Sequence, residues 1–598
     1  MSTLEQTTSG SQPSAELPAR VPRIWPGVLL VAMYWAFVTA LGRLDLEIST
    51  VFLSTMAASA LLLLAFSTWW LTNGTIPRRE RFVDFSLYAL AGIAVGLLCD
   101  PSMGLIGLVF AGVPMVTTAW MAGFALIRRR ESLRRWSVPV VILLVWSLLT
   151  LVRVDGVDGQ NQATISYRWS PSKEDRYLEQ LAAGRTGAPA EEPAAGAEPT
   201  AGQTLEAAEG DWPEFRGANR QGEVHNVRIE TDWDTAPPRA LWRRPIGPAW
   251  SSVVIIGDRL FTQEQRGEQE CVVCLDATTG REIWCHQDKT RYSDGQAGAG
   301  PRATPTFANG SIYSLGASGI LNCLDAASGK LKWTRNIATD SGAPVPMWGF
   351  SSSPLVADDV VVVYCGAEKD KGVLAYRAAD GQEAWSAAAG PSSYSSAQRA
   401  TIDGESQVLF FSDSGLVAVD SKTGTQRWSH DAPGHGTWRV VQPRQLDESS
   451  VLVGSEDLGL VLLELKSEDG SYRVAPRFST RAIRPAYNDF VVCAGFIYGF
   501  DESIFCCVDA QNGKRRWKAG RYGHGQVLLV ADQPLLLVIS ESGEAILLAV
   551  NPEKHEELGR FQAVNGKTWN HPVIAHGKLF TRNDEEIACY ELRMADGK

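Results

Sequence analysis

The feature that most constrains the fold is a short motif that recurs about every 45 to 50 residues through the second half of the chain. Its first copy reads CVVCLDATTGREIWCH, and each copy has an alternating apolar run, a D-x-x-x-G turn and a second short run that carries Trp. Alternation predicts half-buried strands, and the Asp and Gly predict a tight turn between them. The copies lie at residues 271–286, 320–335, 372–387, 415–430 and 505–519, with weaker ones at 459–474 and 545–561.

Two further strand-like runs precede each copy, which gives four short strands per repeat, the signature of a β-propeller blade. Seven complete blades are predicted at residues 250–286, 301–335, 350–386, 395–430, 437–478, 484–519 and 523–562. An eighth, at 570–593, has only three strands. The run 239–247, with Trp242 at the position of the repeated tryptophans, can supply the fourth and remove a free edge. We therefore predict an all-β, eight-bladed propeller closed by an N-terminal strand, with seven blades as the alternative.

The first part of the chain is apolar, with five runs at about 24–42, 51–71, 83–99, 103–127 and 136–152. Each is long enough, or nearly so, to cross a bilayer of about 30 Å, so we predict an α-helical transmembrane region of about five helices. A cleavable signal peptide does not fit, because apolar runs continue past the first. Arginines gather before the first run and after the second and fourth, which predicts a cytoplasmic N-terminus and an extracytoplasmic propeller.

Composition divides the chain into four parts. We predict a cytoplasmic tail at 1–23, the membrane region at 24–154, a largely disordered extracytoplasmic linker at 155–210 and the propeller at 211–598. Residues 1–154 hold 12 Lys and Arg against 8 acids, and the remainder holds 44 against 59. An acidic outer domain argues against nucleic-acid binding. Asp84 and Asp100 lie near the ends of runs, which favours membrane anchoring over transport.

The pattern A-x-D-x-x-T-G-x-x-x-W resembles the PQQ-like repeat, where PQQ is pyrroloquinoline quinone, and the opening DWPEFRGANRQG resembles the start of bacterial PQQ-like propeller proteins. The resemblance covers essentially all of 211–598. Its two relevant branches are the quinoprotein alcohol dehydrogenases and BamB, the scaffold lipoprotein of the outer-membrane β-barrel assembly machine. It implies a multi-pass protein of the bacterial inner membrane with a periplasmic propeller, and it specifies the fold far more strongly than the activity.

Quinoprotein dehydrogenases hold their cofactor under a disulfide between neighbouring cysteines, so Cys506–Cys507 raises the question of such a clamp. Cys507 precedes Asp509 by two residues, just as Cys274 precedes Asp276 in the first copy. This register makes Cys507 a packing residue on one face of a strand, with Cys506 on the other face. Cys271 and Cys274 likewise face opposite sides of a strand. No zinc spacing follows them.

The central funnel is the predicted binding site, because the first strand of each blade lines the channel. Aromatic residues could line its rim: Trp250, Trp348, Tyr394, Tyr522 and Trp569. The predicted ligand-binding residues are Trp250, Arg302, Ser352, Gln398, Arg439, Gln442, Asn488, Asp489, His524, Gln526, Asn570 and His571. The alternative is that channel-lining strands carry polar residues only to satisfy water. His435, His524 and His571 could meet at a metal, but no ligand spacing supports this, so we expect no metal site.

We predict a binding or scaffolding module for a protein, peptide or envelope ligand, reached through the funnel or exposed blade edges. The alternative is a PQQ-dependent dehydrogenase that oxidises an alcohol or sugar. It would need Ca²⁺ held by oxygen ligands, for which Asn488 and Asp489 are the best candidates, but no acidic cluster surrounds them. We expect no cofactor, favour a non-catalytic role and leave catalytic residues unassigned.

Overall fold

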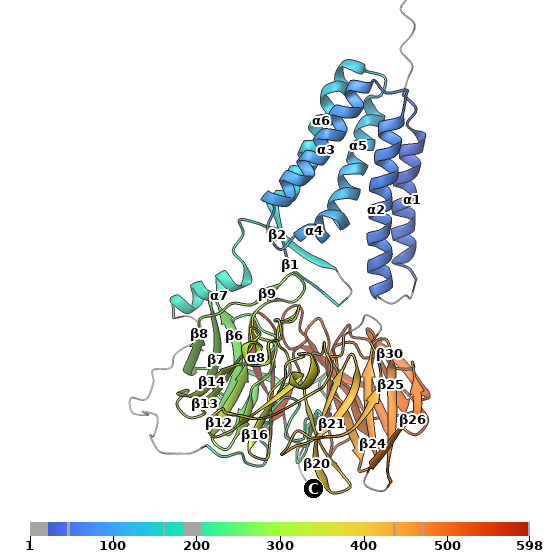
Figure 1. Cartoon of the computed structure of the whole chain (residues 1–598). Coiled ribbons are helices and arrows are strands. Elements are labelled where there is room, and N and C mark those ends of the chain that lie inside the picture. Colours follow the sequence, from blue (N-terminus) through green and yellow to red (C-terminus); the bar gives the residue numbers. More distant parts are fainter. Residues whose placement is uncertain are drawn as a thin grey trace, which may run out of the picture. The chain divides into compact units, whose positions relative to one another are not determined.

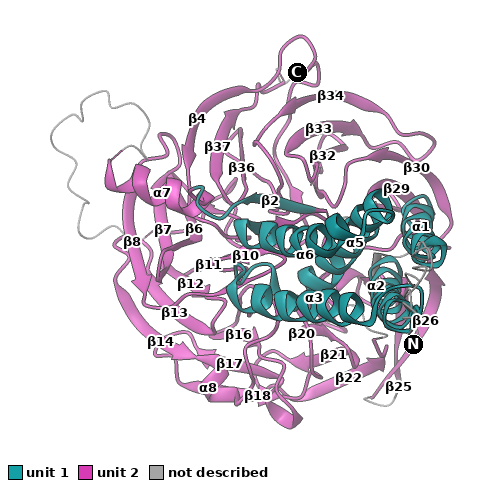
Figure 2. Cartoon of the chain, turned by 90° about the horizontal axis from the view of Figure 1, so that it is seen from above, with its two compact units in different colours: residues 1–155, 163–170 teal, residues 156–162, 171–598 magenta. Residues whose placement is uncertain are grey.

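The computed structural model describes residues 22–44, 48–159, 162–184, 205–434, 438–468 and 471–595 of the 598-residue chain. The chain forms two compact units, residues 1–155 with 163–170 and residues 156–162 with 171–598 (Figure 2). The predicted tail at 1–23 lies almost wholly outside the described residues.

The first unit is a bundle of helices that coincide with the five predicted apolar runs (Figure 1). Within the described residues, four helical stretches are long and apolar enough to cross a membrane, and α1 is a shorter apolar helix. The elements are α1 (Trp25–Leu41), α2 (Ile48–Thr72), α3 (Arg78–Leu98), α4 (Gly104–Gly107), η1 (Leu108–Gly112), α5 (Val113–Ile127), α6 (Glu131–Leu148) and η2 (Leu149–Leu151).

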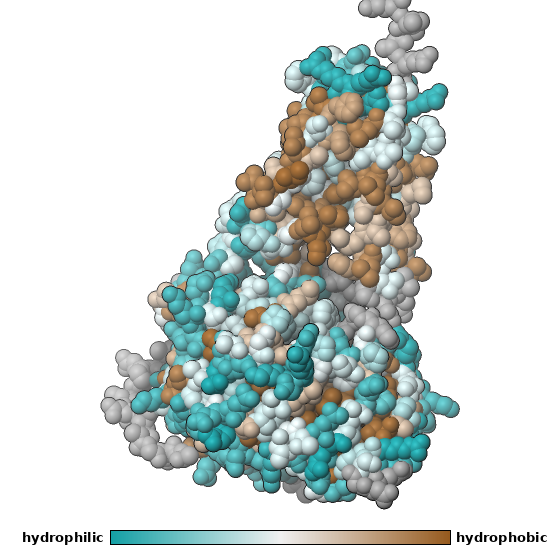
Figure 3. Space-filling model, viewed as in Figure 1, coloured by the Kyte–Doolittle hydropathy of each residue, from teal (hydrophilic) through white to brown (hydrophobic). Residues whose placement is uncertain are grey.

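Much of the outer surface of this bundle is apolar, as the brown areas of Figure 3 show. Leu97 and Leu126 expose 81% and 86% of their surface, which is costly in water and favourable in lipid. The interior holds packed aromatic rings, with Trp70 and Trp120 edge to face and centred 4.6 Å apart. Length, composition and surface together are compatible with helices that cross a membrane.

The second unit contains eight four-stranded antiparallel blades arranged in a ring (Figure 2), so the eight-bladed prediction is confirmed. Blade 1 is β5 (Val254–Ile256), β6 (Arg259–Arg266), β7 (Gln269–Asp276) and β8 (Glu282–Asp288). Blade 2 is β11 (Thr306–Ala308), β12 (Ser311–Leu315), β13 (Ile320–Asp325) and β14 (Leu331–Asn336). Blade 3 is β15 (Leu355–Ala357), β16 (Val360–Tyr364), β17 (Val373–Arg377) and β18 (Glu383–Ala387). Blade 4 is β19 (Gln398–Ile402), β20 (Glu405–Ser412), β21 (Gly415–Asp420) and β22 (Gln426–Asp431).

The remaining blades complete the ring. Blade 5 is β23 (Arg444–Asp447), β24 (Ser450–Ser455), β25 (Gly459–Glu468) and β26 (Ser471–Thr480). Blade 6 is β27 (Val491–Cys493), β28 (Phe496–Asp501), β29 (Ile504–Asp509) and β30 (Arg515–Arg521). Blade 7 is β31 (Gln526–Val530), β32 (Leu535–Ile539), β33 (Glu544–Ala549) and β34 (Glu557–Gln562). Blade 8 is β35 (Val573–Ala575), β36 (Lys578–Arg582), β37 (Glu586–Glu591) and β4 (Arg239–Pro245).

Blade 8 is closed as predicted, because β4 pairs antiparallel with β37 and sets Trp242 opposite Cys589. A further short strand, β3 (Glu223–Val224), pairs parallel with β31 of blade 7. Since both ends of the propeller sequence meet in one sheet, the ring has no free edge at its closure.

Several of the repeated tryptophans bond to the next blade. Trp284 donates its indole N–H to the Ala326 carbonyl at 3.1 Å, and Trp333 donates to Ala378 at 2.9 Å. Gly329, at a φ of +70°, lies under the Trp284 ring, where a Cβ would clash. The motif is therefore an inter-blade joint.

Cys506 and Cys507 occupy consecutive positions of β29, paired opposite Gly499 and Tyr498. Both are buried and free, and they belong to two different hydrophobic clusters on the two faces of the blade. The interpretation of this pair as packing residues is confirmed.

The predicted linker contains regular structure that the composition did not indicate. β1 (Val152–Val157) pairs with β2 (Ala163–Tyr167), and α7 (Lys173–Ala182) follows. A capping box between Ser172 and Asp175 begins α7, and its Tyr177 is 3% exposed. One buried anchor and a strong cap order this helix despite its polar neighbours. Residues 185–204 lie outside the described residues.

Candidate binding site at the mouth of the propeller

The mouth is the face of the propeller at which the first strand of each blade begins. Residues Gly156–Gly159, here called the mouth loop, belong to the propeller unit and lie at this face. Three of their backbone groups bond to Gln296, Lys567 and Glu541. Val157 donates its N–H to the Gln296 carbonyl at 3.2 Å and accepts from Lys567 Nζ at 2.7 Å. Gly159 donates its N–H to Glu541 Oε1 at 2.6 Å. The mouth thus holds a short peptide by its backbone.

Aromatic rings surround these bonds. Trp250 and Trp569 have ring centroids 4.7 Å apart, and Lys567 Nζ lies 4.2 Å from the centroid of Trp569. Tyr487 stacks on His524 at 4.8 Å, and any side chain at Gly159 would clash with both rings. The loop therefore fits closely because glycine presents only backbone here.

Glu541 organises the charged part of this cluster. Its Oε1 also accepts from Trp569 Nε1 at 2.8 Å, and its Oε2 accepts from the backbone N–H of His524 at 3.1 Å. Burial lowers the pKa of His524 and of Lys567, since desolvation opposes their charged forms. His524 is therefore neutral near pH 7. The side-chain carboxylate of Glu541 beside it remains available to accept a peptide N–H.

A second aromatic cluster continues the rim. Trp348 lies 5.0 Å from Tyr394 and 4.9 Å from Trp438, and its Nε1 donates to Gln296 Oε1 at 2.8 Å. Beside it, Met347 is 63% exposed and lines a pocket of about 160 Å³. Gln296 thus joins this pocket to the mouth loop.

The channel itself is crossed by residues Trp212–Val224, here called the channel segment. Arg220 donates to Ala397 of blade 4 at 2.6 Å and to Pro354 of blade 3 at 2.7 Å, and it pairs with Glu214 at 2.9 Å. Arg216 donates to Phe490 of blade 6 at 2.7 Å. One segment can reach the innermost strands of so many blades only along the propeller axis.

The sequence prediction missed this role, although the opening motif DWPEFRGANRQG marks the segment. Its ends are fixed by Trp212, which pairs with Ile255 of blade 1, and by β3 on blade 7. Arg216 and Arg220 both have positive φ, 61° and 55°, so the segment turns sharply to place them. The sequence signal for this segment was the opening motif itself, which precedes the repeats, contains two arginines and lacks the alternation of a strand.

The predicted site residues separate into groups with different neighbours. Trp250, His524 and Gln526 belong to the mouth, where Gln526 donates to Trp569 O at 3.1 Å. Gln398, Asp489 and His571 contact the channel segment through Asn219, Arg216 and Trp212. The others bond within or between blades, or hold a buried polar atom without a protein partner: Arg302, Ser352, Arg439, Gln442, Asn488 and Asn570.

The predicted aromatic residues of the rim do not all lie at the mouth. Trp250, Trp348, Tyr394 and Trp569 lie in the two mouth clusters, whereas Tyr522 contacts His555 at the outer part of blade 7. His435 lies outside the described residues. Among the described residues, no group of three or more His, Cys, Asp or Glu could hold a metal ion.

The sheet order and the repeats define an eight-bladed β-propeller on apolar helices. A family model described as outer membrane protein assembly factor BamB matches residues 268–519. BamB of Burkholderia pseudomallei (strain K96243) is 24% identical over 289 residues, which are 46% of this chain and 68% of that protein. The family model and this relative support the PQQ-like propeller that the repeats predicted.

Similar solved structures come from both branches. BamB from Moraxella catarrhalis has 14% identity and a TM-score of 0.44, over 59% of this chain and 100% of its own. The quinohemoprotein alcohol dehydrogenase from Comamonas testosteroni has 12% identity and a TM-score of 0.49, over 65% of this chain and 82% of its own. These likenesses do not separate a scaffold from an enzyme.

Proposed function

We propose that this chain is a scaffold of the bacterial inner membrane, with a cytoplasmic N-terminus and a periplasmic propeller whose mouth binds a peptide segment of a partner protein. The observation that carries the proposal is the mouth loop, a stretch of the chain's own backbone already held there. The matching family description, an outer membrane protein assembly factor, supports a role in contacting other envelope proteins.

The contacts suit recognition of peptide backbone rather than of one sequence. Gln296 O and Glu541 accept N–H groups, and Lys567 donates to a carbonyl, so the three bonds use backbone groups alone, and only the position of Gly159 also requires a particular residue, glycine. The Trp250–Trp569 pair supplies apolar area at small entropic cost, as aromatic residues do at protein interfaces. The exposed Met347 and the rim pocket extend this surface.

The residues named for a quinone and its calcium ion do not fit that role. Asp489 Oδ1 accepts from the Gln442 N–H at 2.9 Å and lies 3.4 Å from Arg216 Nη1. Its charge is thus already compensated by the channel segment. Since Cys506 and Cys507 are strand-packing residues, no clamp faces the channel. We accordingly propose no cofactor.

A direct test measures peptide binding in detergent. The protein is the whole chain with only residues 156–162 deleted, so that the mouth is free. Fluorescence anisotropy of a labelled peptide with the sequence of residues 154–163 should show saturable binding, weakened about tenfold by Glu541→Gln, which removes one charge-assisted hydrogen bond. Glu544→Gln, on the outer part of blade 7, is the matched control.

Absence of binding, or equal binding by the two Glu→Gln variants, would refute a peptide site at the mouth. A parallel titration with PQQ, with and without Ca²⁺, follows tryptophan quenching. Tight Ca²⁺-dependent binding would instead establish the dehydrogenase alternative and justify an oxidation screen with an artificial electron acceptor.

A further inference from the structure

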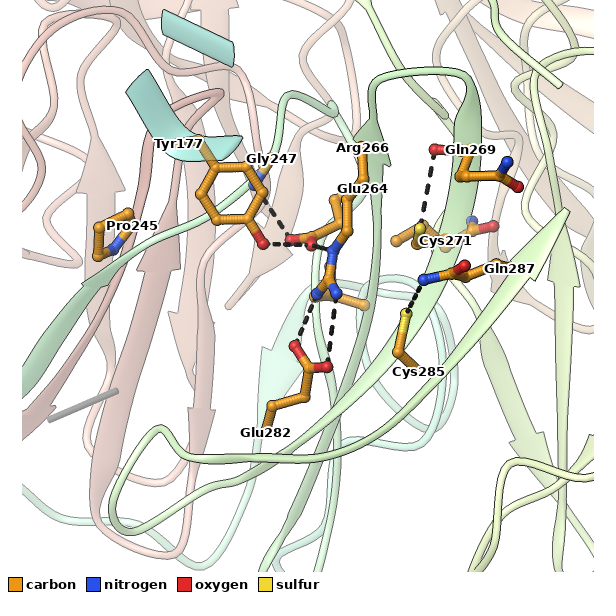
Figure 4. A network of polar contacts seen from close by, with 12 residues as sticks. Tyr177, Pro245, Gly247, Glu264, Arg266, Gln269, Cys271, Glu282, Cys285 and Gln287 are labelled. Carbon is orange, nitrogen blue, oxygen red and sulfur yellow. Dashed lines mark hydrogen bonds and ion pairs between the residues drawn. The ribbon is translucent and has the colours of Figure 1, made fainter. Parts of the chain in front are cut away.

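Blade 1 brings two cysteines together on adjacent strands. Cys271 of β7 is paired opposite Gln287 of β8, and Cys285 of β8 is paired opposite Val273. The cysteines are therefore diagonal neighbours on one face of the blade, because positions two apart on a strand share a face. Figure 4 shows the two cysteines as neighbours on these strands, beside Gln287.

The two thiols differ in exposure and acidity. Cys271 is fully buried and donates weakly to the Gln269 carbonyl at 3.7 Å, whereas Cys285 is half-buried and accepts from Gln287 Nε2 at 3.8 Å. Their mutual contact lowers the pKa of Cys285, with help from the Arg266 guanidinium, and raises the pKa of Cys271. The accessible thiol is thus the more acidic one, and the buried thiol lies behind it.

Cys274, the other half of the C-x-x-C motif, is not part of this pair. It packs in the hydrophobic cluster between blades 1 and 2, on the opposite face of β7. Burial raises the pKa of Cys274 to a value at which it stays a neutral thiol. The chemically distinctive partner of Cys271 is therefore Cys285, which the linear motif does not reveal.

We propose that Cys271 and Cys285 form a redox pair that a disulfide oxidant converts into a cross-strand disulfide. The Cys285 thiolate attacks one sulfur of the oxidant, forms a mixed disulfide and expels one thiolate. The Cys271 sulfur then attacks Cys285 Sγ and expels the second thiolate. The pair loses two electrons and two protons, and the oxidant is reduced to two thiols.

The fold allows the small movement that this bond requires. A disulfide brings the two Cβ atoms to about 3.8 Å, closer than diagonal neighbours normally lie. β8 is the outermost strand of blade 1 and most of its side chains are half-buried, so it can shift toward β7. The inner strands need not move.

The proposed bond adjoins the network that attaches α7 to the propeller (Figure 4). Tyr177 of α7 donates to Glu264 at 2.6 Å, Arg266 pairs with Glu264, and Arg266 Nη2 donates to Glu282 Oε2 at 2.6 Å. Glu264 is paired directly opposite Cys271, and Glu282 lies on β8. Oxidation would therefore fix β8 beside the anchor of α7.

The test treats the full-length protein in detergent with oxidised glutathione, blocks remaining thiols and identifies linked peptides by mass spectrometry. We expect the wild-type protein to lose the mass of two hydrogen atoms and to yield a 271–285 cross-linked peptide. Cys274→Ser should behave as wild type. Cys271→Ser should stop at a glutathione adduct on Cys285, and Cys285→Ser should form neither product.

The wild-type reaction decides the question even if a variant folds poorly. Ten blocked thiols after oxidation, a stable glutathione adduct on wild-type Cys285 or a link between any other pair would overturn the proposal. A second readout is thermal unfolding, which should occur at a higher temperature for the oxidised wild-type protein than for the reduced one. The Cys271→Ser protein should show no such rise.

Discussion

The propeller holds two non-blade segments near its axis, and they are bound in opposite ways. The channel segment is held by buried charges, since Glu214, Arg216 and Arg220 are each less than 5% exposed. The mouth loop is held by hydrogen bonds of its backbone to Gln296, Glu541 and Lys567. A segment bound by buried charges is costly to remove, whereas one bound by its backbone can be exchanged for another peptide.

Desolvation explains why the channel segment is permanent. Burial lowers the pKa of Arg220 to about 10 and raises that of Glu214, so the pair gains little net energy from being charged inside the protein. Removing Arg220 alone, however, leaves the buried Glu214 with the more exposed Arg399 as its cationic partner. The pair therefore specifies the path of the segment more than it stabilises the fold.

The largest expected effect on stability comes from breaking the buried ion pair of the channel segment. Arg220→Met should lower the free energy of unfolding of the propeller by about 3–5 kcal/mol, because the buried Glu214 loses one of its two arginine partners and the carbonyls of Ala397 and Pro354 lose their donor. Thermal unfolding followed by near-UV circular dichroism measures the change. Arg239→Met, which breaks an exposed pair with Glu591, is the control and should cost about 0–1 kcal/mol. Equal unfolding temperatures for the two variants would show that the buried pair of the channel segment matters no more for stability than an exposed pair.

His571 tests the channel segment by pH. Its ring stacks on Trp212, and burial lowers its pKa to about 3, from an ordinary value of about 6.5. The unfolded chain therefore binds the proton first, so stability falls as the pH drops from about 6.5 toward 3, by about 1.4 kcal/mol per unit. The slope of stability against pH should be shallower by that amount in His571→Gln. An unchanged slope would contradict the buried neutral ring.

The mouth loop should respond more weakly and only locally. Lys567→Met removes the donor to the Val157 carbonyl and should raise amide hydrogen exchange in residues 156–159 about tenfold, the equivalent of one hydrogen bond of about 1.4 kcal/mol. Hydrogen–deuterium exchange with mass spectrometry gives the measurement. Lys554→Met, on the outside of blade 7, is the control and should leave the loop unchanged. A global rise in exchange would mean that Lys567 supports the fold instead.

How far the sequence could lead differs between fold and site. Each blade is specified by a local pattern, an Asp–Gly turn and a Trp at fixed spacing. The ring, its closure by the strand that contains Trp242 and the packing of Cys507 were therefore all predictable. The partners of the polar residues on the innermost strands were not, since Arg220 meets Ala397 across 177 positions and Gly159 meets Glu541 across 382. Such long-range contacts form only when the ring closes, and no local sequence pattern predicts them. The predicted site residues remain a prediction of ligand contact.

The smallest effect on stability should come from the rim, where the proposed partner would bind. Met347 is 63% exposed, so Met347→Ser should change the free energy of unfolding by no more than about 0.5 kcal/mol. In the peptide titration, the same substitution should weaken binding of peptides long enough to reach the pocket beside Trp438, and leave the short loop peptide unaffected. Met594→Ser, exposed to 48% at the C-terminal end of the propeller, is the apolar control. Loss of stability without loss of long-peptide binding would show that the rim supports the fold, and that peptide recognition is confined to the three backbone bonds of the mouth.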